Sequence, residues 1–259
     1  MSEQAIKKIL ITGANGFIGG SLMRYYQNHG QDTVGVDLIG NDDDIIEGDI
    51  SQPDTISQQL QECDVIIHTA ALVSNAMQDS DMWQVNVLAT RNLIQAAKEH
   101  KVRRFVQISS IVAYGNSAEG ELDETHPVHA DGGSYVLTKL ASEHVVLSEQ
   151  ANDDIEVVII RPGDAYGPGS RPWIIAPLEA IAKNQFMLPE KGEGFFRPIY
   201  IDDLVRGIAM ASRHPDAAGE IFNLSCEGYM FTKDYFTPHY RWLGKERPVV
   251  VSTKLALKI

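Results

Sequence analysis

The chain alternates between short apolar segments and longer segments in which apolar residues recur at helical spacing. Short apolar runs bounded by polar residues or glycine are typical of buried strands. The segments predicted to be strands are 6–11, 33–36, 64–69, 104–110, 155–161 and 220–225. The segments predicted to be helices are 21–26, 53–62, 81–100, 134–150 and 201–212. Repeated β-α-β units of this kind predict an α/β fold, a doubly wound Rossmann sheet of parallel strands with helices on both faces.

The regular alternation ends after Arg161, where prolines become frequent. They stand at Pro162, Pro168, Pro172, Pro177, Pro189 and Pro198, with glycines between them. Because proline breaks helices and cannot donate a hydrogen bond in a sheet, this stretch predicts a small irregular lobe. We expect a Rossmann domain over 1–162 that carries the catalytic residues, and a segment over 163–259 that is mostly substrate lobe. The strand at about 220–225 is expected to return to the sheet.

A glycine-rich turn follows the first predicted strand, with Gly13, Gly16 and Gly19 in the spacing G-x-x-G-x-x-G. In such a turn the first glycine permits the sharp bend, the second lets the backbone approach a pyrophosphate, and the third lets helix and strand pack closely. The helix N-terminus then offers free N–H groups to phosphates. The alternative hypothesis is that the glycine-rich turn is only structural and binds no ligand. The strand before it, the helix after it and Asp37 at the end of the second strand favour a bound dinucleotide.

The residues after Asp37 bear on which dinucleotide binds. A carboxylate at this position accepts hydrogen bonds from the ribose 2′-hydroxyl and repels a 2′-phosphate. Leu38 and Ile39 supply no arginine to compensate that repulsion. The sequence therefore predicts NAD in preference to NADP.

Composition and charge narrow the range of partners. The 259 residues carry a formal net charge of −13, which argues against nucleic acid or an anionic membrane surface as the main partner. Cys63 and Cys226 lack metal-ligand spacing and are expected to be reduced thiols, and no metal site is predicted. No secretory signal and no apolar run of membrane-spanning length is visible. We expect a cytoplasmic protein that acts on a small-molecule substrate.

Ser110, Tyr135 and Lys139 form the constellation that predicts catalysis. Tyr135 and Lys139 are four residues apart, hence on one face of a predicted helix, and Ser110 ends a predicted strand. A free tyrosine has a pKa of about 10. The lysine ammonium and a positively charged nicotinamide ring would lower that pKa, so that the phenol exchanges a proton with an alcohol or carbonyl. Ser110 would hydrogen-bond the same substrate oxygen.

The chain contains an internal control for this constellation. Tyr229 and Lys233 have the same spacing of four residues, but they follow the last predicted strand and have no matching serine. A surface tyrosine packed on a lysine stem is the ordinary interpretation of such a pair. We therefore assign the chemistry to Tyr135 and treat Tyr229 as structural.

Several motifs occur in order along nearly the whole chain. They are Thr12-Gly13-Ala14-Asn15-Gly16-Phe17-Ile18-Gly19, Gly48-Asp49-Ile50, His68-Thr69-Ala70-Ala71, Val85-Asn86-Val87, Ser109-Ser110-Ile111-Val112-Ala113-Tyr114-Gly115, Tyr135 to Lys139, Arg161-Pro162-Gly163-Asp164-Ala165-Tyr166-Gly167-Pro168-Gly169 and Tyr200-Ile201-Asp202-Asp203-Leu204. As a set they resemble the extended short-chain dehydrogenases/reductases, the group of NAD-dependent epimerases, dehydratases and 3β-hydroxysteroid dehydrogenases.

The resemblance implies roles for individual residues. Tyr135 is similar to the family's acid/base, Lys139 to its partner that also holds the nicotinamide ribose, and Ser110 to the serine that orients the substrate. The residues implied to bind the cofactor are Gly13, Asn15, Gly16, Phe17, Ile18, Gly19, Asp37, Asp49, Ile50, Ala70, Ala71, Asn86, Tyr135, Lys139 and Pro162. For Asn86 the alternative is a helix asparagine that faces solvent.

Departures from the family pattern bear on the substrate. Nucleotide-sugar epimerases similar to this chain carry an arginine where Phe196 stands, and phenylalanine cannot grip a diphosphate. Ser110-Ile111-Val112 replaces the Thr-Asp-Glu triplet of the dehydratases, so dehydration is not expected. Phe195, Phe196 and Trp173 suit an apolar alcohol or ketone, or they are ordinary core of the lobe.

The leading hypothesis is an NAD-dependent oxidoreductase that acts on a secondary alcohol or ketone and is similar to 3β-hydroxysteroid dehydrogenases. The alternatives are a nucleotide-sugar epimerase with the same tyrosine, and a cofactor-binding sensor or scaffold without turnover. The resemblance also implies a homodimer formed by the helices at 81–100 and 134–150. The apolar residues available for it are Met82, Val85, Leu93, Ala97, Leu140, Val145 and Leu147. Alternatively, these residues simply cover the sheet.

Overall fold

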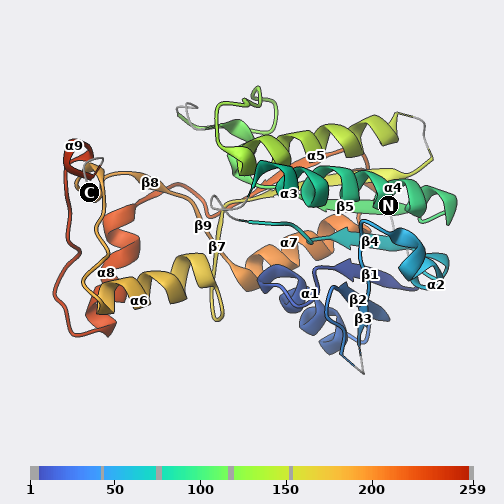
Figure 1. The fold of residues 1–259 in the computed structure, drawn as a ribbon, viewed down its shortest axis with the longest axis horizontal. Helices are drawn as coiled ribbons and strands as arrows, with labels where there is room; N and C mark the ends of the chain where they lie inside the picture. Colours follow the sequence, from blue (N-terminus) through green and yellow to red (C-terminus); the bar gives the residue numbers. More distant parts are fainter. Residues whose placement is uncertain (1–5, 42–43, 74–77, 116–119, 152–153, 257–259) are drawn as a thin grey trace. The chain divides into compact units, whose positions relative to one another are not determined.

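Seven parallel strands form one sheet in the order β10-β6-β5-β4-β1-β2-β3 (Figure 1). Their bounds are β1 Ile9–Thr12, β2 Thr33–Asp37, β3 Ile45–Glu47, β4 Val65–His68, β5 Arg104–Ile108, β6 Glu156–Pro162 and β10 Ile221–Leu224. The chain builds outward from β1 in one direction and from β4 in the other, so the strand order reverses between these two strands. Ligands bind beyond the carboxyl ends of the strands at such a point. The predicted doubly wound fold is confirmed.

The computed structural model describes residues 6–41, 44–73, 78–115, 120–151 and 154–256. The chain divides into two compact units. Unit 1 comprises Met1–Pro162 and Val205–Leu224, and unit 2 comprises Gly163–Leu204 and Ser225–Ile259. Val205–Leu224, which includes β10, thus belongs with the sheet.

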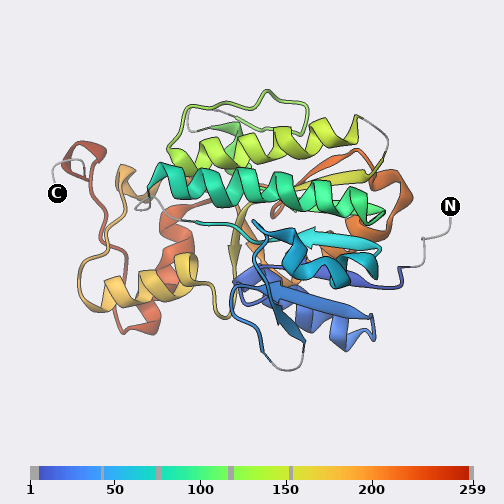
Figure 2. The same ribbon diagram turned by 45° about the vertical axis from the view of Figure 1, so that its right-hand side comes forward.

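Helices cover both faces of the sheet in unit 1. They are α1 Phe17–Asn28, α2 Ser57–Gln61, α3 Asp79–Trp83, α4 Thr90–Glu99, α5 Ser134–Gln150 and most of α7 Ile201–Arg213. Among the described residues, unit 1 also contains the short 3₁₀ helices η1 Pro53–Ile56, η3 Ile111–Tyr114 and η6 Pro215–Ala217 and the π-helical segment η2 Gln84–Ala89. Helices α4 and α5 lie side by side on one face, and α1 and α7 lie on the other (Figures 1 and 2). Tyr26 of α1 and Ser212 of α7 share a hydrogen bond of 3.0 Å between their hydroxyl oxygens.

One hydrophobic cluster of unit 1 lies between the sheet and the α4–α5 layer, and α1 and α7 bury further apolar residues on the other face. Leu93 and Ala97 of α4 and Val146 of α5 are fully buried against strand residues such as Ile66 and Phe105. Strands covered on both faces read as continuous apolar runs rather than as an alternation, which is the pattern of this sequence. Four of the residues considered for a dimer surface, Met82, Leu93, Ala97 and Leu140, are buried within the chain.

The helix predicted at 81–100 begins earlier and contains a wider turn. Helix α3 runs directly into a π-helical segment, η2 Gln84–Ala89, and then into α4. A π-helical segment inserts a residue into the helical register, and such segments are frequent at functional sites. Asn86 lies within it.

Unit 2 contains two small sheets and three helices within the residues that the structure describes. Strand β7 Asp164–Tyr166 pairs in parallel with β9 Pro198–Tyr200, and β8 Phe195–Phe196 pairs antiparallel with β11 Met230–Phe231. The helical segments are η4 Arg171–Ile175, α6 Ala176–Ala182, η5 Glu190–Gly192, α8 Thr232–Trp242 and α9 Thr253–Ala256. Its core gathers Leu188, Phe196, Tyr235 and Phe236, with Trp173 packed against them. Among the described helices, none is long and apolar enough to cross a membrane.

Candidate functional site

The glycine-rich turn joins β1 to α1 at the carboxyl edge of the sheet. Gly13 has a φ of 69°, and a Cβ there would lie 2.8 Å from the main-chain nitrogen of Ala70. A Cβ on Gly19 would overlap the carbonyl oxygen of Gly13. Helix α1 follows Gly16, and among the described residues no side chain caps it and no acid stands in its first turn. The uncapped N–H groups and the bare backbone fit the phosphates of a dinucleotide.

Asp37, the last residue of β2, is bound directly to this turn. The main-chain N–H of Asn15 donates to Asp37 Oδ2 at 2.9 Å, and that of Leu38 donates to Oδ1 at 2.8 Å. The Asn15 side chain donates to the Ile39 carbonyl at 2.7 Å. These bonds hold the carboxylate at the end of its strand with acceptor capacity left for hydroxyl groups.

The other residues expected to bind the cofactor follow neighbouring strands. Phe17 and Ile18 open α1, Asp49 and Ile50 follow β3, Ala70 and Ala71 follow β4, and Pro162 ends β6. Asp49 accepts a hydrogen bond from the Ser51 N–H at 2.8 Å. Because parallel strands end at the same edge, the fold brings these residues to one edge of the sheet.

Asn86 is 3% exposed, which excludes the interpretation that it faces solvent. Its Oδ1 accepts from the Leu72 N–H at 2.8 Å, and its Nδ2 donates to the Leu72 carbonyl at 3.0 Å and to Thr138 Oγ1 at 3.1 Å. The Thr138 hydroxyl in turn donates to the main-chain oxygen of Tyr135 at 3.1 Å. Asn86 therefore ties the segment after β4 to the first turn of α5.

His68 lies fully buried between two threonines. The Thr90 hydroxyl donates to the Asn86 carbonyl at 2.9 Å, so it accepts from His68 Nε2, 3.0 Å away. The imidazole Nδ1 is then left to accept from the Thr12 hydroxyl at 2.7 Å. Burial, and secondarily the charge of Lys139, lowers the pKa of His68 to about 3. The imidazole is neutral at physiological pH.

The structure brings Ser110, Tyr135 and Lys139 together beyond the end of β5. Ser110 caps η3, its Oγ accepting from the Val112 N–H at 3.3 Å, and its hydroxyl lies near enough to Tyr135 to lower the pKa of that phenol. Lys139 follows Tyr135 by one turn of α5, with its ammonium nitrogen 5.9 Å from the centre of the tyrosine ring. That ammonium donates to the Ile108 carbonyl at 2.9 Å.

The protonation of this trio differs from the sequence-based expectation. Burial raises the pKa of Tyr135 to about 12, and the nearby Ser110 hydroxyl opposes that rise. The chain by itself therefore holds a neutral phenol, because burial removes the charged phenolate from water. Burial also lowers the pKa of Lys139 to about 8, while the negative charge of Glu143 acts in the opposite direction. The arrangement can donate a proton from Tyr135 to an oxygen that Ser110 holds.

Tyr229 and Lys233 do not form an equivalent pair. Tyr229 is 55% exposed and precedes β11, whereas Lys233 lies in the first turn of α8. The ammonium of Lys233 lies 5.0 Å from the centre of the Phe231 ring. The two residues share no helix, so the spacing of four has no structural meaning there.

Glu143 and Arg161 form a buried ion pair beside the trio that the sequence reasoning did not single out. Arg161 donates from Nη2 and Nε to the two carboxylate oxygens of Glu143, at 2.7 and 3.0 Å. The Ser109 hydroxyl donates to the same carboxylate at 2.5 Å, and Arg161 Nη1 donates to the Tyr114 hydroxyl at 3.0 Å. The available signal was the spacing of four that places Glu143 one helical turn after Lys139.

Unit 2, considered by itself, contains an acid in an aromatic environment. Asp164 accepts from the Arg197 N–H at 3.2 Å, and burial raises the pKa of its carboxyl group to about 6. Phe196 packs in the core of this unit, with its ring centre 4.1 Å from that of Tyr235. The Arg197 guanidinium hydrogen-bonds the Gly228 carbonyl. Sequence reasoning missed Asp164, because an aspartate after a proline-glycine pair looks like an ordinary turn residue.

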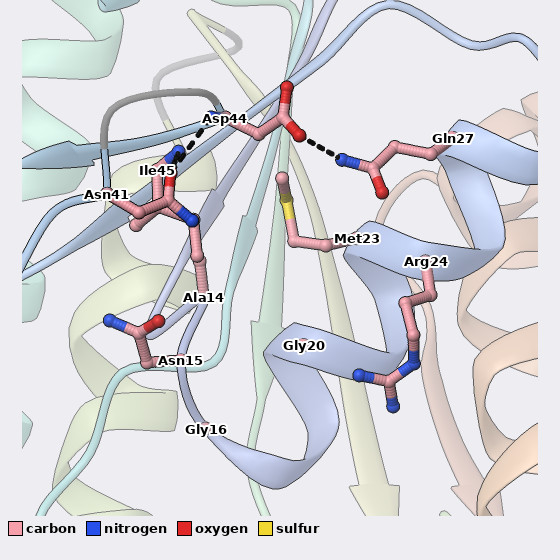
Figure 3. Close-up of a pocket in the computed structure, with 10 residues that line it drawn as sticks. All are labelled: Ala14, Asn15, Gly16, Gly20, Met23, Arg24, Gln27, Asn41, Asp44 and Ile45. Carbon is pink, nitrogen blue, oxygen red and sulfur yellow. Dashed lines mark hydrogen bonds between the residues drawn. The ribbon is translucent and has the colours of Figure 1, made fainter.

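A cavity of about 300 Å³ lies beside the glycine-rich turn (Figure 3). Its walls come from α1 and from the start of β3, with Gln27 donating to Asp44 at 2.8 Å across one side. The lining residues are Ala14, Asn15, Gly16, Gly20, Met23, Arg24, Gln27, Asn41, Asp44 and Ile45. None of Ser110, Tyr135 and Lys139 lines it, so it is not the catalytic centre.

Comparison with known proteins identifies relatives over most of the chain. Residues 9–225 match the model of the NAD dependent epimerase/dehydratase family. A UDP-glucose 4-epimerase of Vibrio cholerae is 30% identical over 85% of this chain and 70% of its own length. A decarboxylating sterol-4-alpha-carboxylate 3-dehydrogenase of Candida albicans is 27% identical over 93% of this chain and 74% of its own.

A solved structure agrees with this assignment. The UDP-glucuronic acid 4-epimerase from Bacillus cereus in complex with NAD has a TM-score of 0.83 and 27% identity, covering 95% of this chain and 86% of its own. The matched residues include the glycine-rich turn, Asp37, Ser110, Tyr135 and Lys139. The chain therefore belongs to the NAD dependent epimerase/dehydratase family and is an NAD-dependent enzyme of the extended short-chain dehydrogenase/reductase type.

Proposed function

We propose that the protein is an oxidoreductase that transfers a hydride between NAD and a secondary alcohol or ketone, with Tyr135 as the acid/base. The observation that carries the proposal is the meeting of Ser110, Tyr135 and Lys139 beyond the end of β5. NAD supplies the hydride acceptor or donor when bound. Gly13, Gly19 and the N-terminus of α1 fit its phosphates.

In the reduction of a ketone, Tyr135 donates its phenolic proton to the carbonyl oxygen. In the oxidation of an alcohol, the phenolate accepts the hydroxyl proton. Ser110 hydrogen-bonds the same oxygen and orients the carbon for transfer. Lys139 stabilises the phenolate by its charge and binds the nicotinamide ribose. Burial raises the pKa of Tyr135 to about 12. To form the phenolate near neutral pH, the enzyme therefore needs the positive charge of Lys139 and that of the nicotinamide ring when NAD is bound.

The cofactor is proposed to be NAD rather than NADP. The Asp37 carboxylate is fixed by the N–H groups of Asn15 and Leu38, so it cannot readily turn away from a 2′-phosphate. A fixed negative charge at this point favours the two ribose hydroxyls and disfavours the phosphate.

The proposed reaction is tested by a substrate screen. NADH production is followed by absorbance over a panel of steroid, terpenoid and simple secondary alcohols, with UDP-glucose and UDP-galactose in parallel. NADH formed with an alcohol and not with the UDP-sugars supports the oxidoreductase. A protein that binds NAD and turns over none of the alcohols contradicts it.

A nucleotide-sugar epimerase is the second candidate. The similarity to the 4-epimerases of Vibrio cholerae and Bacillus cereus favours it. Phe196, at the position of the diphosphate-binding arginine, argues against it because its side chain is 3% exposed and cannot contact a diphosphate. Since Phe196 and Trp173 both pack in the core of unit 2, the preference for an apolar substrate rests on the missing arginine alone. Interconversion of UDP-glucose and UDP-galactose without net NADH would identify the epimerase.

A third candidate is a sensor or scaffold that binds NAD without turnover. The complete trio argues against it, because binding alone requires no serine placed beside Tyr135. A wild-type protein that binds NAD but turns over none of the alcohols or UDP-sugars would favour this candidate.

We also propose a homodimer formed by the α3–α4 and α5 layer. Trp83 and Leu88 are 40% and 42% exposed on this layer, although Met82 and Leu93 beside them are buried in the chain. Covering two such side chains is favourable. Light scattering at micromolar concentration should give a dimer, and Leu88→Glu should give a monomer. A monomeric wild type removes this proposal.

We also propose that the protein is cytoplasmic. The support for this proposal is that Cys63 and Cys226 are both free thiols, with Cys63 buried. Free thiols persist in reducing compartments.

A further inference from the structure

The ion pair between Glu143 and Arg161 is almost completely removed from solvent. The Glu143 side chain is 1% exposed and that of Arg161 is 3% exposed. Each carboxylate oxygen accepts from the guanidinium, and one of them also accepts from Ser109. The guanidinium lies 4.8 Å from the centre of the Tyr114 ring.

Stability alone does not account for such a pair. Removing two charges from water costs about as much as their mutual attraction returns, so buried pairs are commonly neutral for stability. The contacts of the Glu143 carboxylate indicate another purpose. It joins α5 to Ser109, just beyond β5, and to Arg161 on β6. The helix that carries Tyr135 and Lys139 is thereby fixed to the strand ends at the site.

Lys139 lies one turn before Glu143 on the same helix and is 5% exposed. The ionisable groups nearest to it are Tyr135 and Glu143 on α5 and His68 on β4, and the Arg161 guanidinium on β6 lies behind Glu143 as its ion-pair partner. His68 is neutral, and burial keeps Tyr135 neutral in the chain by itself. Among these neighbours, Glu143 therefore supplies the negative charge. A buried ammonium without such a charge loses its proton.

We propose that Glu143, held by Arg161 and Ser109, is a positioning residue that fixes Lys139 beneath Tyr135 and keeps the lysine ammonium charged. The proposal rests on the function proposed above, because it assigns Glu143 the task of maintaining the partner of the acid/base. Glu143 contacts neither substrate nor the reacting atoms in this scheme. Arg161 and Ser109 serve to hold its carboxylate in place.

The direct test is the titration of Lys139 followed by NMR in protein labelled with ¹³C at lysine Cε, assigned with Lys139→Arg. Glu143 raises the pKa of Lys139, so Glu143→Gln should lower the midpoint below the wild-type value of about 8. An opposite charge nearby shifts a pKa by about one unit or more, which is the expected size of the change. This readout needs no turnover and no bound cofactor.

The matched control is the pair of Arg104 and Glu156 at the opposite, amino-terminal ends of β5 and β6. Arg104 is fully buried and donates to Glu156 at 2.7 Å. Glu156→Gln should affect folding stability without moving the Lys139 midpoint or the pH profile of turnover. An equal shift in both variants would mean that the change is a general loss of packing, and would overturn the proposal.

Glu143→Gln leaves the Arg161 charge buried without its partner, so it is expected to weaken folding. The variant Glu143→Gln/Arg161→Met removes both charges and keeps a side chain of similar length. Because the double variant also removes the positive charge of Arg161, its Lys139 midpoint should fall by less than in Glu143→Gln but should stay below the wild-type value. A folded double variant whose Lys139 titrates as in the wild type overturns the proposal.

Turnover supplies a second readout. If Lys139 acts as an ammonium, the decline of kcat at high pH should move to lower pH in Glu143→Gln by the shift seen in NMR, while kcat near pH 6 changes little. If the proposed function fails and no substrate is turned over, the NMR titration still decides the inference. If the midpoint moves and the kcat profile does not, Glu143 sets the charge of Lys139 without serving catalysis, and the proposal is wrong.

Discussion

The Lys139 ammonium lies 5.9 Å from the centre of the Tyr135 ring and donates its hydrogen bond to the Ile108 carbonyl. The lysine is therefore anchored to the end of β5, beside the ring of Tyr135. Its remaining N–H groups are available to ribose hydroxyls. This geometry leaves room for the two tasks proposed for Lys139, which are to supply a charge and to bind the ribose.

Lys139→Ala should therefore lower both the rate and the affinity for NAD. Loss of the charge removes the stabilisation proposed for the phenolate during turnover, and the rate is expected to fall about 100-fold or more. NAD affinity is measured by fluorescence titration and the rate by NADH absorbance. Lys233→Ala is the control and should change neither. A Lys139→Ala variant with wild-type affinity would show that this lysine does not bind the ribose.

Gly19→Ala should impair NAD binding and folding together. The added methyl would overlap the Gly13 carbonyl oxygen, so the glycine-rich turn must move away from α1. Gly20→Ala is the neighbouring control, because its Cβ would lie 3.2 Å from the Ala14 carbonyl oxygen and only a small shift is required. Its effect on the free energy of unfolding should stay within about 1 kcal/mol. Equal NAD affinity in the two variants would contradict the close approach inferred at Gly19.

The sheet, the glycine-rich turn and the meeting of Ser110, Tyr135 and Lys139 were predictable because each leaves a local pattern. Continuous apolar runs mark the strands, three glycines mark the turn, and a spacing of four places Tyr135 and Lys139 on one helical face. The family assignment was predictable for the same reason, since its motifs are short and ordered along the chain.

Features that depend on burial were not predictable in this way. The pKa of Tyr135 rises rather than falls because its surroundings exclude water, and no sequence pattern reports that exclusion. Arg161 and Glu143 meet across 18 residues of sequence, through the packing of α5 on β6. Helix α8 was missed because it contains Pro238 and several aromatic residues, which obscure helical periodicity.

His68 should make the protein sensitive to mild acid. Its pKa is about 3 in the folded chain, against about 6.5 for an unperturbed histidine. Below pH 6.5 the unfolded chain binds a proton that the folded chain does not, so the free energy of unfolding falls as the pH falls towards 3. The slope contributed by one such group is about 1.4 kcal/mol per pH unit.

Chemical denaturation between pH 7 and pH 4.5 measures this dependence. His68→Gln, which retains hydrogen-bonding groups and cannot titrate, should be less stable at pH 7 but should lose less on acidification. If wild type and variant lose stability in parallel, His68 is not buried as a neutral imidazole.

Asp37→Ala should reduce the discrimination between NAD and NADP. The substitution removes the charge that opposes a 2′-phosphate and the acceptor for the ribose hydroxyls. NAD affinity should fall and NADP affinity should rise, as measured by titration of both cofactors. In the wild type, equal or tighter binding of NADP would defeat the assignment of Asp37.

Proton transfer by Tyr135 is the central step of the proposed reaction, and one pair of variants tests it most directly. Tyr135→Phe removes only the hydroxyl, so turnover should fall by about 10²–10⁴-fold while NAD still binds. Tyr229→Phe removes the hydroxyl of an exposed tyrosine with the same lysine spacing and should leave turnover nearly unchanged. Turnover that falls equally in both variants, or in neither, would contradict the assignment of Tyr135.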